Sequence, residues 1–457
     1  MSGGDTITTR TKPGVDADRS RRTGNGGGDV RLRRSAIAVA AVTMITASAC
    51  GGDTGPPTLN WYINPDNGGQ AELAEKCTDE AGGAYRVETS ILPNNASAQR
   101  EQLIRRLAAN DSSIDLMSVD PPFVPEFAEA GFLLDIPDER AEEFTDGVVE
   151  SAVTGATWRD ELVGIPFWAN TQLLWYKQSV AEQAGLDPEA GPVTWEQIID
   201  AAEQTGTTIA VQANRYEGYT VWINALIEGA GTSVLLNPEA EVEDLELGLK
   251  EPGAEEGAAV IANLVDAGVA GPAVSTAGEE EARALFQGDD GGFMVNWPYI
   301  WQAANGEVDA GALDASFIED LRWTIYPETV EGEDSAPPFG GITLGIGAFT
   351  EYPDEAMEAA ACITSPESRT EYMLFSGNPS ASEESYSDPE VVEAFPMAET
   401  ILESLQNAKP RPQTPFYNEV SESLQRTYHP PSSVQPDSTP DEAAELIVGV
   451  LNKEVLL

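Results

Sequence analysis

The sequence predicts an α/β protein of two lobes, each built on a doubly wound, mainly parallel sheet, and three observations support this fold class. First, 457 residues are more than one small hydrophobic core can organise, so two lobes are expected. Second, strand-like and helix-like segments alternate from residue 59 to residue 119, which is the order of a parallel sheet. Third, an aromatic-rich run at 164–177, GIPFWANTQLLWYK, predicts a strand buried on both faces, and a second series of helices and strands follows it.

The first fifty residues are typical of an export signal rather than of a folded domain. Three arginines precede an apolar segment, residues 36–47, that is too short to span a membrane, and small residues then lead to Cys50. This ending resembles the bacterial lipoprotein signal, in which the cysteine is lipidated and becomes the first mature residue, although Ala47 stands where leucine is usual. We expect a signal peptide at 1–50 and a tether at 51–57; a signal that is simply cleaved is the alternative.

Polar side chains follow each of the first three predicted strands, which we place at 59–63, 85–92 and 114–119. Helices at 70–81 and from Ser97, as N-cap, to residue 110 separate these strands. Because ligands of open α/β sheets bind outside the carboxyl ends of the strands, the polar side chains share one ligand-facing edge. Their oxygen acceptors suit a polyhydroxylated ligand, whereas the alternative for each is simple turn chemistry. They are Asp66, Asn67, Asn94, Asn95 and Asp120.

The second unit begins after residue 177 and places a tryptophan at the end of a strand. The capping pattern Thr-x-x-Gln at 194–197 opens a helix. Another helix begins near the acidic run Glu279-Glu280-Glu281 and ends at Gly288, and a strand at 292–296 then leads into Trp297. An indole ring offers apolar area for stacking on a sugar ring, although core packing is the commoner role of a single tryptophan. Further expected elements are a strand at 209–212 and helices at 219–229, 254–267, 352–364, 420–427 and 441–453.

Two glycines and one arginine are further candidates for contact with a ligand. Gly340 and Gly341 open the apolar run FGGITLGIGAF, but no helix start and no basic residue accompany them, so a nucleotide site is discounted. They would instead let the backbone approach a ligand or another strand closely. Arg411 lies between two prolines in a chain with few cations, and a surface salt bridge or a ligand contact would each explain it.

The charge balance excludes whole classes of partner. A formal net charge of −52 repels nucleic acid and anionic lipid surfaces. Self-repulsion at this charge is strong unless salt screens it over about 10 Å, so we expect the protein to work in a high-salt milieu. Cys77 and Cys362 are expected to form one disulfide if the fold brings them together, and two buried thiols otherwise.

Several motifs together make this chain resemble the extracytoplasmic sugar-binding lipoproteins of bacterial ABC importers, solute-binding protein family 1. These motifs are the cysteine at position 50, the Asn-Thr-x-Leu-x-Tyr type crossover at 170–176, the run from Phe286 to Pro298, and the glycine pair. The resemblance covers essentially all of residues 58–457. Within this family the chain is most similar to the trehalose-binding lipoproteins of actinobacteria. That similarity lies in AQREQLIRRLAAND at 98–111, NTQLLWY at 170–176, VNWP at 295–298 and RPQTP at 411–415.

The resemblance implies a periplasmic-binding-protein fold that closes on a disaccharide. Lobe I would comprise 58–170 and 346–385, and lobe II 171–345 and 386–457, joined by strands that cross between them. Cys77 and Cys362 would share lobe I. The implied ligand-binding residues are Asp66, Asn94, Asp120, Asn170, Glu279, Trp297, Gly340, Gly341 and Arg411, with Glu279 favoured over Glu280 and Glu281.

The expected function is capture of a trehalose-type disaccharide and its delivery to ABC permease subunits served by a cytoplasmic ATPase. The protein would be a monomer held by lipid at the extracytoplasmic face of the membrane, with no cofactor, no metal and no nucleic-acid partner. Maltose-type glucosides would present similar surfaces. A lipid-anchored glycoside hydrolase with two carboxylates about 5–10 Å apart is the enzymatic alternative. His429, the single histidine, would be the one candidate for a catalytic triad, and no motif accompanies it. An adhesive lipoprotein is the third possibility.

Overall fold

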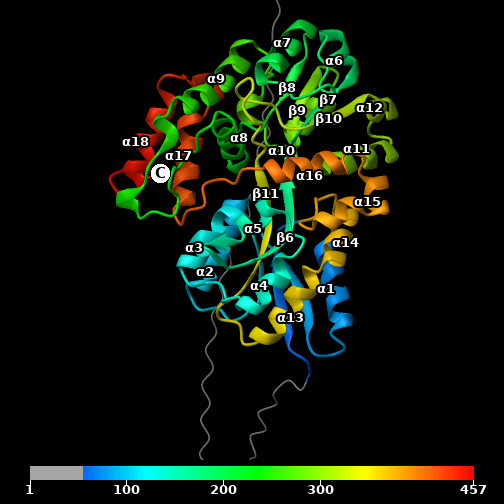
Figure 1. Cartoon of the computed structure of the whole chain (residues 1–457), viewed down its shortest axis with the longest axis vertical. Coiled ribbons are helices and arrows are strands. Elements are labelled where there is room, and N and C mark those ends of the chain that lie inside the picture. The colour runs from blue at the N-terminus through cyan, green and yellow to red at the C-terminus, as the bar shows by residue number, and fades with distance from the viewer. Residues whose placement is uncertain (1–54) are drawn as a thin grey trace, which may run out of the picture. The chain divides into compact units, whose positions relative to one another are not determined.

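The computed structural model describes residues 55–457, so the predicted signal peptide, Cys50 and most of the tether lie outside the described residues. Two sheets organise this part of the chain (Figure 1). The first has the order β2-β1-β3-β11-β6 and the second the order β10-β7-β9-β8. Their strands are β1 (Thr58–Ile63), β2 (Arg86–Ile91), β3 (Leu116–Val119), β6 (Ile165–Thr171), β7 (Leu173–Lys177), β8 (Thr208–Ala210), β9 (Gly291–Asn296), β10 (Leu321–Thr324) and β11 (Phe339–Ile346). A small hairpin pairs β4 (Thr157–Trp158) with β5 (Glu161–Leu162).

Helices surround both sheets, as expected for an α/β protein. In chain order they are α1 (Gly69–Glu80), α2 (Ala96–Leu107), α3 (Val124–Glu129), α4 (Asp138–Thr145), α5 (Glu150–Gly155), α6 (Gln178–Ala184), α7 (Trp195–Thr205), α8 (Glu217–Glu228), α9 (Pro252–Asp266), α10 (Glu279–Gln287), α11 (Tyr299–Asp309), α12 (Ala315–Asp320), α13 (Pro353–Ile363), α14 (Pro366–Ser376), α15 (Pro389–Ala394), α16 (Ala398–Asn407), α17 (Tyr417–Tyr428) and α18 (Thr439–Leu451). Among residues 55–457, every helix falls short of the length and apolar character that a membrane span requires.

Both sheets are mixed rather than mainly parallel, which differs from the sequence-based expectation. The strands β2, β1 and β3 are parallel, as predicted, and Trp61 lies between Thr89 and Leu116 in their register. However, β11 runs antiparallel to both β3 and β6. In the second sheet only the β8–β9 pair is parallel. The physical reason is that β6, β7 and β11 lie where the chain passes between the sheets, so they are not joined to neighbours by the helical crossovers that parallel pairing requires.

The run at 164–177 forms two strands instead of the single strand predicted. The chain leaves β6 after Thr171 and enters β7 at Leu173, so β6 belongs to the first sheet and β7 to the second. All residues of both strands are buried except Lys177, which is partly exposed. Continuous burial makes one long strand and two successive strands look alike in sequence, because neither produces an alternating pattern.

The chain returns to the first sheet earlier than the predicted boundary at 345/346. Strand β11 begins at Phe339 and pairs with β3 and β6 along its length. Helix α15 packs on α14, and α16 packs on α5 and β6, whereas the expected boundaries place 386–457 in lobe II. By contrast, α17 packs on α8 and α18 on α9 (Figure 1).

Of the two helix N-caps predicted from the sequence, the structure confirms one and moves the other. The capping box at α7 is present: Thr194 accepts from the Gln197 backbone N–H at 3.1 Å, and Gln197 accepts from the Thr194 N–H at 3.0 Å. Helix α2 is capped by Asn95, which accepts from the Ala98 N–H, and not by Ser97 as predicted. Asparagine is among the strongest N-cap residues, so the helix begins after Asn95, two residues before the predicted cap Ser97.

A disulfide links Cys77 of α1 to Cys362 of α13, with a Cα–Cα distance of 5.9 Å. The two cysteines are 285 residues apart in the sequence. Their helices contact each other beside the five-stranded sheet, and Leu73 and Ala359 of the same two helices belong to its buried core. The bond therefore ties the amino-terminal helix to a segment that returns late in the chain.

Candidate functional site

A cavity of about 820 Å³ is lined by residues from both sheets and from the segments that connect them. All nine side chains and glycines proposed as ligand-binding from the sequence line it. They are Asp66, Asn94, Asp120, Asn170, Glu279, Trp297, Gly340, Gly341 and Arg411. The structure thus brings residues from position 66 to position 411 to one place.

The first sheet contributes polar residues that follow its parallel strands. Asp66 follows β1, Asn94 follows β2 and Asp120 follows β3, so the three meet at the carboxyl edge of the sheet. The Asp66 carboxylate accepts backbone N–H groups of Gly68 at 3.0 Å and Gln70 at 2.8 Å, which is the turn chemistry expected of aspartate. Asn94 is exposed and its amide makes no hydrogen bond to another described residue. Its four hydrogen-bonding positions remain available to a ligand.

The glycine pair of β11 allows two close approaches. A Cβ at Gly341 would lie 2.3 Å from the Trp168 carbonyl oxygen of the neighbouring strand, and the φ angle of Gly341 is +115°. Only glycine adopts such a conformation readily. A Cβ at Gly340 would lie 3.0 Å from the six-membered ring of Trp297. The Trp297 indole therefore rests beside the Gly340 backbone, partly exposed and facing the cavity.

The three acidic residues at the start of α10 have different surroundings. Glu281 folds back and accepts the Gly278 backbone N–H at 3.1 Å. Glu280 accepts from Arg283 at 2.6 Å and from the Tyr299 hydroxyl. Glu279 is the member of the three that lines the cavity. Burial, reinforced by the nearby charge of Glu280, raises the pKa of Glu279 to about 7, although the polar groups of Tyr299 and Trp297 oppose this shift.

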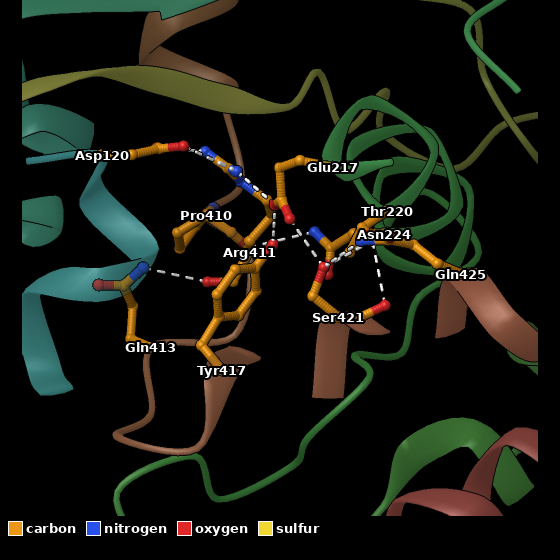
Figure 2. Close-up of polar contacts among 10 residues, drawn as sticks. All are labelled: Asp120, Glu217, Thr220, Asn224, Pro410, Arg411, Gln413, Tyr417, Ser421 and Gln425. Atoms are coloured by element: carbon orange, nitrogen blue, oxygen red, sulfur yellow. Dashed lines mark hydrogen bonds and ion pairs between the residues drawn. The ribbon is translucent and has the colours of Figure 1, made fainter. Parts of the chain in front are cut away.

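Arg411 does not present a free guanidinium to the cavity, because two carboxylates hold it (Figure 2). Its Nη2 donates to Asp120 Oδ1 at 2.6 Å, and its Nη1 donates to Asp120 Oδ2 at 3.2 Å and to Glu217 Oε1 at 2.6 Å. Only 4% of the arginine side chain is exposed. Of the two sequence-based alternatives, the ion pair is present, but it is buried rather than on the surface.

Glu217 connects this ion pair to the helices of the second lobe. Its carboxylate also accepts from the hydroxyls of Tyr417 and Ser421, and Ser421 is in turn bonded to Thr220 (Figure 2). Burial raises the pKa of the Glu217 carboxyl, and the Arg411 charge works against that shift. The Asp120–Arg411–Glu217 cluster therefore joins the end of β3 to the start of α8 through the segment before α17.

Several lining residues were missed by sequence reasoning. Gln212 follows β8, so the strand-end rule applied to the first sheet would also have selected it. Tyr299 lies two residues after Trp297 and lines the same wall. Glu217 had no distinguishing signal, because the sequence contains 77 acidic residues and its role depends on Arg411. Within residues 55–457, no group of three or more histidine, cysteine or acidic side chains is arranged to hold a metal ion.

Comparison with known proteins identifies the family. The model of the family described as bacterial extracellular solute-binding protein matches residues 70–370. A probable ABC transporter-binding protein of Deinococcus radiodurans is 26% identical over 384 residues, covering 80% of this chain and 86% of that protein.

Among solved structures, maltose-bound MalE3 of T. maritima matches with a TM-score of 0.74 at 23% identity, covering 87% of this chain and 100% of its own. The GacH receptor of Streptomyces glaucescens matches with a TM-score of 0.69 at 18% identity, covering 87% of this chain and 98% of its own. These likenesses show the two-lobe α/β fold predicted from the sequence. Because the family model spans more than half of the chain, this protein belongs to the bacterial extracellular solute-binding proteins.

Proposed function

We propose that this protein is the substrate-binding component of an ABC sugar importer, and that it captures a disaccharide of the trehalose type in the cavity. The observation that carries the proposal is the composition of the lining. Amide and carboxylate side chains at strand ends surround the partly exposed indole of Trp297. A volume of about 820 Å³ lies within the usual range of small-molecule sites, about 300–1,000 Å³.

This lining suits hydroxyl groups, each of which donates one hydrogen bond and accepts up to two. Asn94, Asn170 and Asp66 would bind hydroxyls from the first lobe, and Glu279 would bind them from the second. Trp297 would cover the apolar face of one sugar ring, supported from behind by the Gly340 backbone. The wrong sugar would leave some of these groups unpaired in a partly buried site, which is how such sites discriminate.

The proteins with similar folds favour the same ligand class. Solved relatives include one with bound maltose, one solved with acarbose and one with bound D-mannitol. All three ligands are rich in hydroxyl groups. The choice of α,α-trehalose within this class rests on the sequence similarity at 98–111, 170–176, 295–298 and 411–415.

The proposed mechanism is binding without chemistry. A ligand that contacts both lobes stabilises the closed arrangement more than the open one and shifts the equilibrium between them. The closed, loaded protein would then deliver the sugar to the permease subunits. Attachment through a lipid on Cys50 would keep a monomer at the extracytoplasmic face of the membrane, close to its permease.

Calorimetric titration of the purified chain with a disaccharide panel tests this function. We expect a dissociation constant in the micromolar range for α,α-trehalose, about −8 kcal/mol, and weaker binding of maltose, sucrose and lactose. Recovered sugar should be unchanged after prolonged incubation. Release of glucose would favour the glycoside hydrolase alternative, and the absence of heat with every disaccharide would overturn the proposal.

A further inference from the structure

The charges that line the cavity do not balance. Four acidic side chains line it, namely Asp66, Asp120, Glu217 and Glu279, whereas Arg411 is the one cationic side chain lining it among residues 55–457. Arg411 is already bonded to both Asp120 and Glu217. These three groups together keep a net negative charge, and no further cation of the lining offsets the other two carboxylates.

Those two carboxylates differ in how they are stabilised. Asp66 accepts two backbone N–H groups at the start of α1 and a hydroxyl hydrogen bond from Tyr372 at 3.3 Å. Glu279 has no ion-pair partner among the described residues. The nearest candidate, Arg283, is bonded to Glu280 at 2.6 Å and to Glu307 at 2.7 Å. Glu279 therefore faces the cavity without an ion-pair partner among residues 55–457.

The groups around Glu279 do not supply such a partner. From its own helix it is near Glu280, Glu281 and Arg283, of which the arginine is paired as described. The titratable groups that face it from other elements are Tyr216, which precedes α8, and Tyr299 of α11. Burial, reinforced by the charge of Glu280, raises the pKa of Glu279 to about 7, and the opposing effects of Tyr299, Trp297 and the paired Arg283 do not cancel this shift.

Resting on the proposed function, we propose that Glu279 is a charge-selecting residue that makes the cavity prefer amine-bearing sugars over neutral ones and reject anionic sugars. An ammonium group within hydrogen-bonding distance of Glu279 supplies the missing counter-charge, and this attraction is stronger in a partly buried site than in bulk water. A phosphate or carboxylate on the sugar meets like charges at close range and loses its hydration without compensation. The ligand class is thus neutral to cationic glycosides.

The test uses calorimetric titration at pH 7.5 and low salt with three kinds of probe. The first is α,α-trehalose, the second is a set of mono-amino trehaloses with the amine replacing the 2-, 3-, 4- or 6-hydroxyl, and the third is trehalose 6-phosphate. We expect at least one amino analogue to bind tenfold or more tightly than trehalose, and the phosphate to bind at least tenfold more weakly. At pH 5.5 the Glu279 carboxyl is protonated, so the ratio of amine to neutral affinity should fall towards one.

Two variants assign the effect to this carboxyl. Glu279→Gln should reduce the ratio of amine to neutral affinity to about one at pH 7.5 and should abolish its pH dependence. Glu203→Gln, an exposed position on α7, changes the net charge equally and should leave the ratio unchanged.

The possible results separate this inference from the function on which it rests. If trehalose binds but no amino analogue binds more tightly, the inference is wrong and the sugar-binding function stands. The inference is likewise wrong, with the sugar-binding function intact, if Glu279→Gln keeps the full amine preference. If none of the probes binds, the proposed function itself fails and the inference fails with it.

Discussion

Replacing Arg411 by methionine should destabilise the protein strongly, because it leaves the buried carboxylate of Glu217 and the largely buried carboxylate of Asp120 without their counter-charge. The arginine side chain is 4% exposed, Asp120 is 16% exposed and Glu217 is 8% exposed. Each ion pair is worth up to about 4 kcal/mol at short range and intermediate dielectric, before desolvation is subtracted. Breaking one partner of a buried pair typically costs about 3–5 kcal/mol, and we expect a loss of unfolding free energy in this range at pH 8.

The pH dependence of this loss provides an internal check. In the Arg411→Met variant the pKa of Glu217 should rise further, because burial remains and the arginine that opposes it is gone. The folded variant then holds a proton that the unfolded chain releases above about pH 4.5. Its unfolding free energy should therefore increase as the pH falls through the folded pKa, by up to about 1.4 kcal/mol per pH unit.

Urea unfolding of the wild type and three variants measures the effect. The matched control is Arg322→Met, because Arg322 is one-third exposed and lies 3.9 Å from Glu189, so its loss should cost about 0.5 kcal/mol or less. The double variant Arg411→Met/Glu217→Gln should recover part of the lost stability, since the buried charge is removed with its partner. A loss below about 1 kcal/mol for Arg411→Met, independent of pH, would refute the reasoning.

Further predictions concern the cavity wall, the disulfide and the surface charge. Trp297→Ala should weaken sugar binding about tenfold or more while urea unfolding changes little, because the partly exposed ring faces the cavity; unchanged affinity would contradict its stacking role. Gly341→Ala should lower the unfolding free energy by about 1–3 kcal/mol through its φ of +115°, whereas Gly340→Ala should mainly displace the Trp297 ring and weaken binding; equal stability losses would argue against this distinction. Replacing Cys77 and Cys362 by serine should cost about 2–5 kcal/mol, and an unaltered urea midpoint would be inconsistent with a stabilising bond. Raising NaCl from low to molar levels should raise the melting temperature, since salt screens a net charge of −52; a fall would disprove self-repulsion as a dominant cost.

Much of the cavity was predictable because one topological rule places it. Residues that follow parallel strands meet at the carboxyl edge of the sheet, which brought Asp66, Asn94 and Asp120 to one wall. The same rule also selects Gln212, which follows β8 of the second sheet and lines the cavity. Gly340 and Gly341 were recognisable because paired glycines at the head of an apolar run signal close backbone approach.

Other features depended on contacts that no local pattern records. The division of the run at 164–177 between two sheets followed from pairing with β11 and β9, because continuous burial hides where one strand ends. The roles of the three acidic residues at the start of α10 were likewise not predictable from the local sequence. Glu279, Glu280 and Glu281 are equivalent in sequence, and only the positions of Gly278 and Arg283 leave Glu279 free to face the cavity.

The sequence by itself determined the α/β class, the strand ends that carry polar groups and the acidic character of the surface. These properties follow from local periodicity, turn chemistry and composition, each of which acts over a few residues or over the whole chain at once. Only the tertiary structure decided the ionic state of the site. Arg411 lies 291 residues from Asp120 and 194 residues from Glu217. The charge left for a ligand depends on which carboxylates that one arginine reaches, because a buried charge is governed by its spatial neighbours and not by its position in the chain.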